Sequence, residues 1–135
     1  MTTTHRPGRP GKEAGQEAVE FALLLPLLLL IVFGVLDLGR AFHAAVVVAN
    51  ASRVGARYAM NYPADTAEIK AAARAEADGS GIVLTDGDIA VGCPSGCGSN
   101  LPVRVTVTYD FTLVTGFVFP DPSIQIERYT EMLVP

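Results

Sequence analysis

The strongest hydrophobic pattern in the chain lies near its N-terminus, between residues 16 and 38. Within this stretch, residues 21–36 carry no charge and would be apolar on every side of a helix. A bilayer crossing needs ~20 mostly apolar residues, and the helical flanks of this run supply the remainder. A surface helix of a soluble domain keeps one polar face instead. The pattern therefore predicts a membrane-spanning helix, with a buried core helix as the alternative.

Two residues, Pro26 and Glu20, are unusual for a membrane-spanning helix. Pro26 lies inside it, where the missing N–H removes a hydrogen bond to the Ala22 carbonyl and should bend the helix. The bend is either a permanent kink or a helical turn that loses its hydrogen bonds locally and lets the helix straighten. Glu20 stands at the lip of the run with no basic residue within a helical turn, and an acid there costs free energy unless it meets a partner.

The helical pattern continues after the apolar run through residues 39–62. It should end before Pro63, because the residue that precedes a proline is disfavoured in the helical conformation. Ala51, Gly55 and Ala59 recur at every fourth position and predict a face of small residues that lets another backbone approach closely. The approaching segment is either the head of this chain or another subunit.

The remaining residues, 63–135, combine one short helical pattern with several strand patterns. Asp65 to Glu68 has the form of a capping box and opens an Ala-rich helix that ends near Gly79, which we expect to lie on a sheet. Strands are predicted at residues 82–85, 88–91, 102–114 and 123–133, of which 102–114 alternates most strictly. The fold class is therefore α+β, with a small antiparallel sheet.

Charge and composition exclude several classes of function. The net charge of -4 and the pI of about 5.0 argue against a nucleic-acid partner. His43 has no Ser or Cys nucleophile beside it, and the chain shows no phosphate loop and no metal-ligand spacing. We therefore expect no enzyme, cofactor, metal or small-molecule substrate.

Three residues separate Cys93 from Cys97, whereas a redox C-x-x-C motif has two. If the head lies outside the membrane, a disulfide that pins this loop is expected, and two free thiols are the alternative.

The first fifteen residues carry Arg6, Arg9 and Lys12 ahead of the apolar run. Basic residues at this position hold the N-terminus in the cytoplasm, so the residues after the run should emerge outside. A secretory signal that is cut at Ala49-Asn50-Ala51 is one interpretation, but the apolar run is long for such a signal. A cut at the other end of the run, after Gly15, fits the pattern better.

The residues around that position resemble a type IV prepilin processing site, with a basic leader that ends in Gly15, then Gln16, and an acid at the fifth mature position, Glu20, before Phe21. The resemblance extends to about Tyr62, and it is to the TadE-like family, the minor pilins or pseudopilins of tight-adherence (Flp-type) pilus systems. The segments that carry it are QEAVEFAL (16–23), LPL (25–27), FGVLDLGRA (33–41) and SRVGARYA (52–59).

This resemblance implies a leader of residues 1–15 that a prepilin peptidase removes, a transmembrane and extended helix at 16–62, and a pilin-like outer head at 63–135. It implies a single-pass protein of the bacterial cytoplasmic membrane that helps assemble a surface pilus, and it leaves open whether the protein is itself pilus-associated. Its partners would be membrane lipid, the peptidase, other pilin or pseudopilin subunits and the assembly machinery. In the assembly, the new Gln16 amine would pair with Glu20 of a neighbour. In the alternative, Glu20 faces headgroups and water, and the chain is a permanently anchored envelope protein whose head binds another envelope component.

Overall fold

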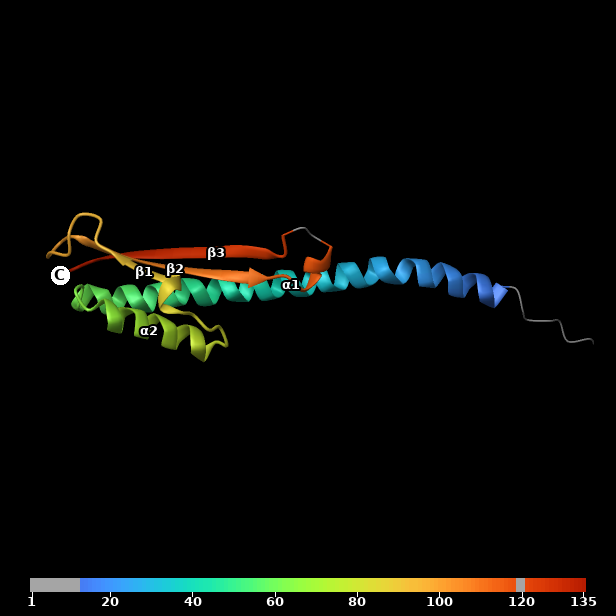
Figure 1. Ribbon diagram of the computed structural model, residues 1–135, viewed down its shortest axis with the longest axis horizontal. Coiled ribbons are helices and arrows are strands. Elements are labelled where there is room, and N and C mark those ends of the chain that lie inside the picture. Colours follow the sequence, from blue (N-terminus) through green and yellow to red (C-terminus); the bar gives the residue numbers. More distant parts are fainter. Residues whose placement is uncertain (1–12, 119–120) are drawn as a thin grey trace, which may run out of the picture.

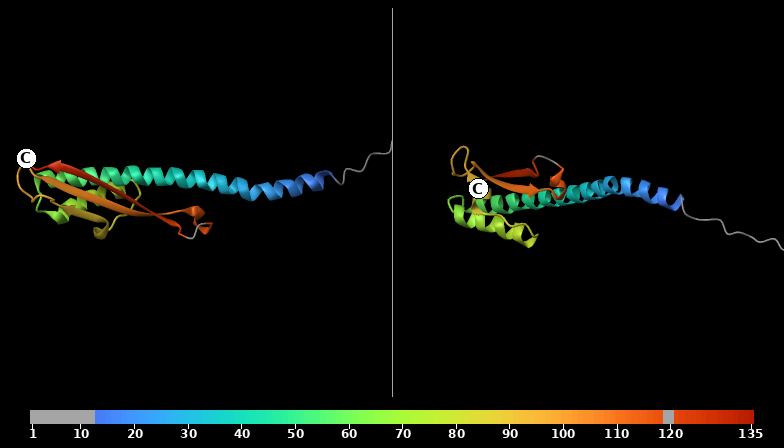
Figure 2. Two further views of the ribbon diagram at one scale, coloured as in Figure 1. Left: turned by 90° about the horizontal axis from the view of Figure 1, so that it is seen from above. Right: turned by 45° about the vertical axis from the view of Figure 1, so that its right-hand side comes forward.

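A single long helix, α1 (Glu13–Asn61), runs through most of the length of the molecule (Figure 1). The computed structural model describes residues 13–118 and 121–135. The predicted basic leader residues Arg6, Arg9 and Lys12 lie outside these described residues. The helix ends at Asn61, before Pro63 as the sequence predicts. Its N-terminal half, coloured blue to cyan, projects away from the rest of the fold in all views (Figure 2).

The sheet has three antiparallel strands in the order β1-β2-β3, with bounds β1 (Ile89–Gly92), β2 (Pro102–Thr112) and β3 (Ser123–Leu133). In the central strand, Val105 lies opposite Val91 on one side and Thr130 on the other. Two 3-10 turns complete the elements, η1 (Asp86–Asp88) before β1 and η2 (Val114–Phe117) between β2 and β3. Together with the helices, this antiparallel sheet confirms the predicted α+β class.

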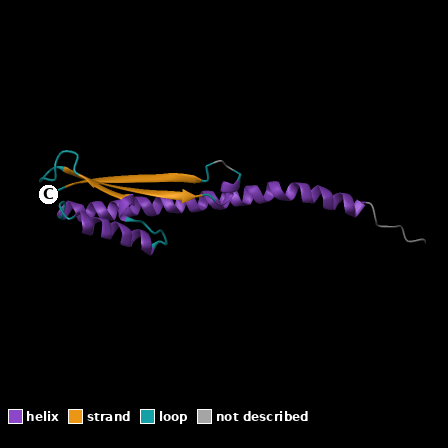
Figure 3. Ribbon diagram, viewed as in Figure 1, coloured by secondary structure: helices purple, strands orange, loops and turns teal. Residues whose placement is uncertain are grey.

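The C-terminal half of α1 lies between the sheet on one side and the second helix, α2 (Thr66–Gly79), on the other (Figures 1 and 3). The predicted cap of α2 is present, because the Asp65 carboxylate accepts a hydrogen bond from the Glu68 N–H at 3.2 Å. The prediction that α2 lies on the sheet is wrong, since α2 packs mainly along α1. Its buried face is Ile69, Ala73 and Ala77, and these mostly small side chains allow the two helices to approach closely.

The hydrophobic core is formed where these three layers meet. Inward residues of β2 alternate along the strand as predicted, and Val103, Val105 and Val107 are fully buried. They pack with buried residues of α1 and α2, among them Val48 and Ile69. The core therefore fixes the sheet and α2 to the second half of α1 and leaves the first half uncovered.

The strand predicted at residues 82–85 is wrong, because this segment is extended but pairs with no other strand among the described residues. Ile82 and Leu84 are buried and Val83 is exposed, so the alternating pattern reflects burial rather than strand pairing. The segment is tied to the end of α2, where the Ile82 N–H donates to the Ala77 carbonyl at 3.0 Å. The edge of β2 is paired instead by β1, along residues 89–92.

Candidate functional site

The exposed half of α1 is the main candidate surface. Every residue from 15 to 36 is exposed, including the large apolar side chains Phe21, Leu28 and Phe33. The most apolar 18-residue window of the helix has a mean hydropathy of 2.7, and none of it is buried. An apolar helix that is uncovered on every side has the character of a membrane-spanning segment. The chain therefore fits a protein that crosses a membrane once, at this segment.

The candidate processing residues Gly15, Gln16, Glu20 and Phe21 occupy the first turns of this exposed segment. Glu20 follows Gln16 by four residues, so the two lie on the same side of the helix, one turn apart. Within residues 13–118 and 121–135, no hydrogen bond or ion pair joins the Glu20 side chain to another residue. A Cβ atom added at position 15 would meet no neighbouring atom within 4 Å.

Helix α1 continues without interruption through Pro26. Its N-terminal part, in blue, is inclined to the remainder of the helix (Figure 2). Proline in a helix interior lacks the N–H that would bond to the preceding turn, and inclination of the two segments is the usual consequence.

The exposed run ends at a buried carboxylate, that of Asp37, which sequence analysis did not single out. Its oxygens accept hydrogen bonds from the backbone N–H groups of Val114 and Thr115, at 3.0 and 2.8 Å, and from the Thr115 hydroxyl at 2.8 Å. The Arg40 guanidinium donates to the same carboxylate at 2.9 Å. Several donors that converge on one carboxylate stabilise its charged form, so Asp37 fastens the turn η2 to α1.

The small-residue face of α1 is covered within the chain itself. Ala51 and Ala59 are fully buried, and a Cβ atom added to Gly55 would lie 3.1 Å from a Val105 methyl and 3.3 Å from the Ala73 Cβ. The head of this chain therefore occupies the face, with β2 on one side and α2 on the other.

A polar contact reinforces this packing, because the hydroxyls of Ser52 on α1 and Thr130 on β3 are 2.8 Å apart. Sequence analysis missed this contact, since it joins residues 78 positions apart.

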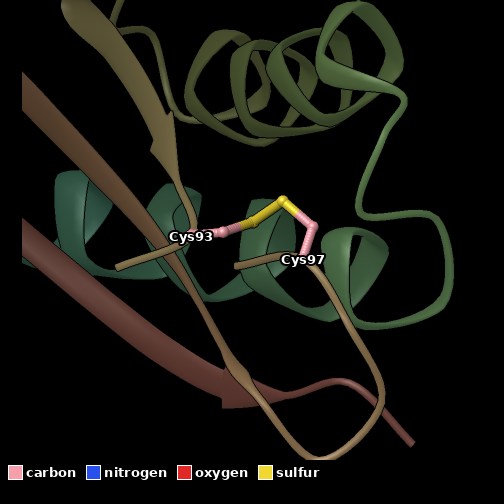
Figure 4. The surroundings of a disulfide bond; sticks show 2 residues. All are labelled: Cys93 and Cys97. Atoms are coloured by element: carbon pink, nitrogen blue, oxygen red, sulfur yellow. A yellow bond between two sulfur atoms is a disulfide. The ribbon is translucent and has the colours of Figure 1, made fainter. Parts of the chain in front are cut away.

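The two cysteines are joined by a disulfide, Cys93–Cys97, in the loop that follows β1 (Figure 4). This loop lies at the end of the fold opposite the projecting half of α1 (Figure 1). Cys93 packs against the edge of the hydrophobic core.

The described residues hold no cluster of three or more His, Cys, Asp or Glu side chains suited to a metal ion. His43 is exposed on α1, and its Nε2 lies 3.3 Å from the Ser80 carbonyl oxygen. The Asp88 carboxylate is bonded to the Thr85 N–H and hydroxyl at 2.7 and 2.8 Å. These polar groups make contacts within the fold, and the largest exposed feature of the described residues is the apolar half of α1.

In a comparison with protein families, the family model described as TadE-like protein matches residues 15–57. The match confirms the TadE-like resemblance that the sequence indicates over this stretch. It begins at Gly15 and extends through the exposed half of α1 into the half that carries the head. No curated protein and no solved structure matches the chain.

Proposed function

We propose that this chain is a minor pilin-like subunit of a tight-adherence (Flp-type) pilus system, inserted in the bacterial cytoplasmic membrane with its N-terminus inside and its head outside. A prepilin peptidase removes residues 1–15, residues 16–62 form the membrane-spanning and extended helix, and residues 63–135 form the outer head. The mature subunit then joins other pilin or pseudopilin subunits and the assembly machinery. The TadE-like match supports this proposal because it covers the cleavage motif and the whole apolar helix.

The observation that carries the proposal is Glu20, an exposed acid at the start of an uncovered apolar helix, with no partner in the described part of the chain. When such helices pack together, the carboxylate leaves water and needs a positive partner. Cleavage after Gly15 would create that partner, the ammonium group of Gln16. The helix dipole disfavours a positive charge at a helix N-terminus, so the Gln16 amine gains further from a carboxylate on an adjacent subunit.

Gly15 adds an independent argument. Glycine within a helix costs roughly 0.5–1 kcal/mol relative to alanine. A Cβ atom at position 15 would meet no neighbour within 4 Å, so packing within the chain does not require glycine there. This openness is consistent with the role proposed for Gly15, which is recognition by a peptidase.

The experiment compares wild type with Glu20→Gln, and uses Glu17→Gln as the matched control because Glu17 is an exposed acid on the same helical turn. Each variant is expressed with the remaining pilus components, and cleavage is followed by immunoblot and N-terminal sequencing. We expect all three proteins to begin at Gln16. Glu20→Gln alone should lose crosslinking to pilus components and lose piliation.

Processing is tested separately by Gly15→Leu, which should leave the leader attached. A mature N-terminus at Met1, or one near Ala51, would refute the pilin proposal. Normal cleavage of Glu20→Gln with unchanged partner capture would refute the pairing role of Glu20.

The second candidate is a permanently anchored envelope protein whose outer head binds another envelope component. One observation favours it: the head is fastened to α1 through Asp37 and a shared core, so helix and head form one body suited to tethering. For such a tether Glu20→Gln should be neutral. The Glu20 comparison therefore separates the two functions.

A further inference from the structure

The turn between β2 and β3 exposes an unusual number of apolar side chains. Phe117 is 80% exposed, and Val114 and Val118 are 53% and 48% exposed. The turn lies at the end of the sheet that faces the projecting half of α1 (Figure 1). A soluble loop tip normally carries polar residues, and exposed apolar clusters mark surfaces that contact a membrane or a partner.

The turn also reaches along α1 beyond the end of the head. Phe117 and Val118 face Pro26, Leu29, Leu30 and Phe33 across an open groove of about 330 Å³, and these six described lining residues are all apolar. Leu30 and Phe33 precede Asp37 by seven and four residues, which places them about 6–11 Å further into the apolar run at 1.5 Å per residue. The tip of the turn therefore overlaps the segment that crosses the membrane.

Most backbone N–H groups of the η2 turn are hydrogen-bonded within the protein, as an apolar environment requires. In a bilayer, an irregular segment is tolerated only where its N–H and C=O groups find partners within the protein. The N–H groups of Val114 and Thr115 donate to Asp37. Those of residues 113, 116 and 118 donate to backbone carbonyls at 2.8, 3.3 and 3.0 Å. The Thr115 hydroxyl is bonded to Asp37 as well, so these five N–H groups and the hydroxyl all find partners within the protein.

We propose that the η2 turn is a second membrane-inserted element, in which Val114, Phe117 and Val118 enter the outer leaflet beside α1 and the groove holds a lipid acyl chain. The groove is continuous with the exposed apolar surface of α1, and its described lining residues offer no polar side chain to a peptide or a solute. Insertion fixes the height and tilt of the head above the membrane. This inference rests on the membrane anchor of the proposed function, but not on cleavage or on pilus assembly.

The test uses the absence of tryptophan from the sequence, which makes any introduced Trp a unique fluorescent reporter. Phe117→Trp places it at the tip of the turn, where the exposed ring leaves the core undisturbed. Leu28→Trp reports the membrane-spanning run, and Tyr62→Trp reports the exposed position that directly follows the far end of α1. The full chain carrying each change is reconstituted into phosphatidylcholine vesicles whose acyl chains are brominated, and Trp fluorescence is compared with that in unbrominated vesicles.

We expect Phe117→Trp to show blue-shifted emission and a loss of fluorescence comparable to that of Leu28→Trp, while Tyr62→Trp is not quenched. A quenched Leu28→Trp with an unquenched Phe117→Trp would overturn the inference and leave the anchor intact, because water or protein would then cover the turn. An unquenched Leu28→Trp would overturn the membrane anchor itself, and with it the proposed function. Val118→Trp, in the groove lining, provides a second reporter with the same expected result.

Discussion

The carboxylate of Asp37 and the main chain of Thr115 are joined by a 2.8 Å hydrogen bond across 78 positions of sequence. A second bond of the same length connects the Thr115 hydroxyl to the same carboxylate oxygen. Asp37 is the first charged residue after the apolar run, so the contact lies at the junction between the uncovered half of α1 and the head. It holds the η2 turn, which follows β2, against α1 at this junction.

The Thr115 hydroxyl is buried, and its removal should weaken this junction. Thr115→Val keeps the size and the backbone bond but loses the hydroxyl donor, and we expect the free energy of unfolding of the head to fall by roughly 1–3 kcal/mol. Urea unfolding of the detergent-solubilised protein measures it. Thr115→Ser keeps the hydroxyl and should lose less. Equal losses in the two variants would contradict the role assigned to the hydroxyl.

The close approach at Gly55 gives a second prediction. Gly39→Ala, where a Cβ meets no atom within 4 Å, should raise the free energy of unfolding by roughly 0.5–1 kcal/mol through helix propensity. Gly55→Ala should lack this gain, because its Cβ would crowd Val105 and Ala73. Gly55→Leu should lower the free energy of unfolding by roughly 1–3 kcal/mol. Chemical denaturation of the three variants measures their free energies of unfolding and so checks the predicted order. A stabilising Gly55→Leu would show that the small-residue face of α1 is not packed as described.

The disulfide closes a loop with a sequence separation of only 4, so it constrains the unfolded chain little. Replacement of both Cys93 and Cys97 by Ala should cost at most about 2 kcal/mol by loop-closure entropy and leave the head folded. Circular dichroism and denaturation in the presence and absence of reductant provide the measurement. Complete unfolding of the double variant would mean that the loop contributes to the core far more than its position suggests.

The orientation in the membrane can be measured with fusions. A reporter that is active only outside the cytoplasm should work when fused after Pro135, because the basic residues Arg6, Arg9 and Lys12 hold the N-terminus inside. The same reporter fused before Gln16 should be inactive. Replacement of the three basic residues by neutral ones should reduce the difference in reporter activity between the two fusions. If the unmodified chain instead gave an active fusion before Gln16 and an inactive one after Pro135, the disulfide loop would lie in the reducing cytoplasm.

Local patterns in the sequence were sufficient for the secondary structure of most of the chain. The apolar run, the end of α1 before Pro63, the cap of α2 at Asp65 and the alternation in β2 each depend on a few neighbouring residues. Such features are set by backbone preference and periodicity, which a single sequence carries directly. The motif at Gly15 and Glu20 also spans only neighbouring residues, and it was found through its resemblance to a prepilin processing site.

Two wrong predictions show what local sequence patterns do not determine. The segment at residues 82–85 alternates like a strand, but β1 takes the edge of β2 and leaves it unpaired. Helix α2 carries an apolar side that fits a sheet or a helix equally well, and only the fold placed it along α1. Periodicity reports which side chains are buried and does not identify the segment that buries them.

The contacts that sequence analysis missed join residues that are distant in the chain. Asp37 meets Thr115, Ser52 meets Thr130, and Phe117 faces Leu30, although each pair is far apart in the chain. In the sequence, Asp37 suggests only an i, i+3 ion pair with Arg40. Nothing near it indicates the η2 turn that it binds. The sequence by itself determined an apolar helix with an acid at its start and a small-residue face further along. Only the tertiary structure decided what covers each part of that helix, because the β2–β3 register and the packing of the core bring the turn to the end of the apolar run.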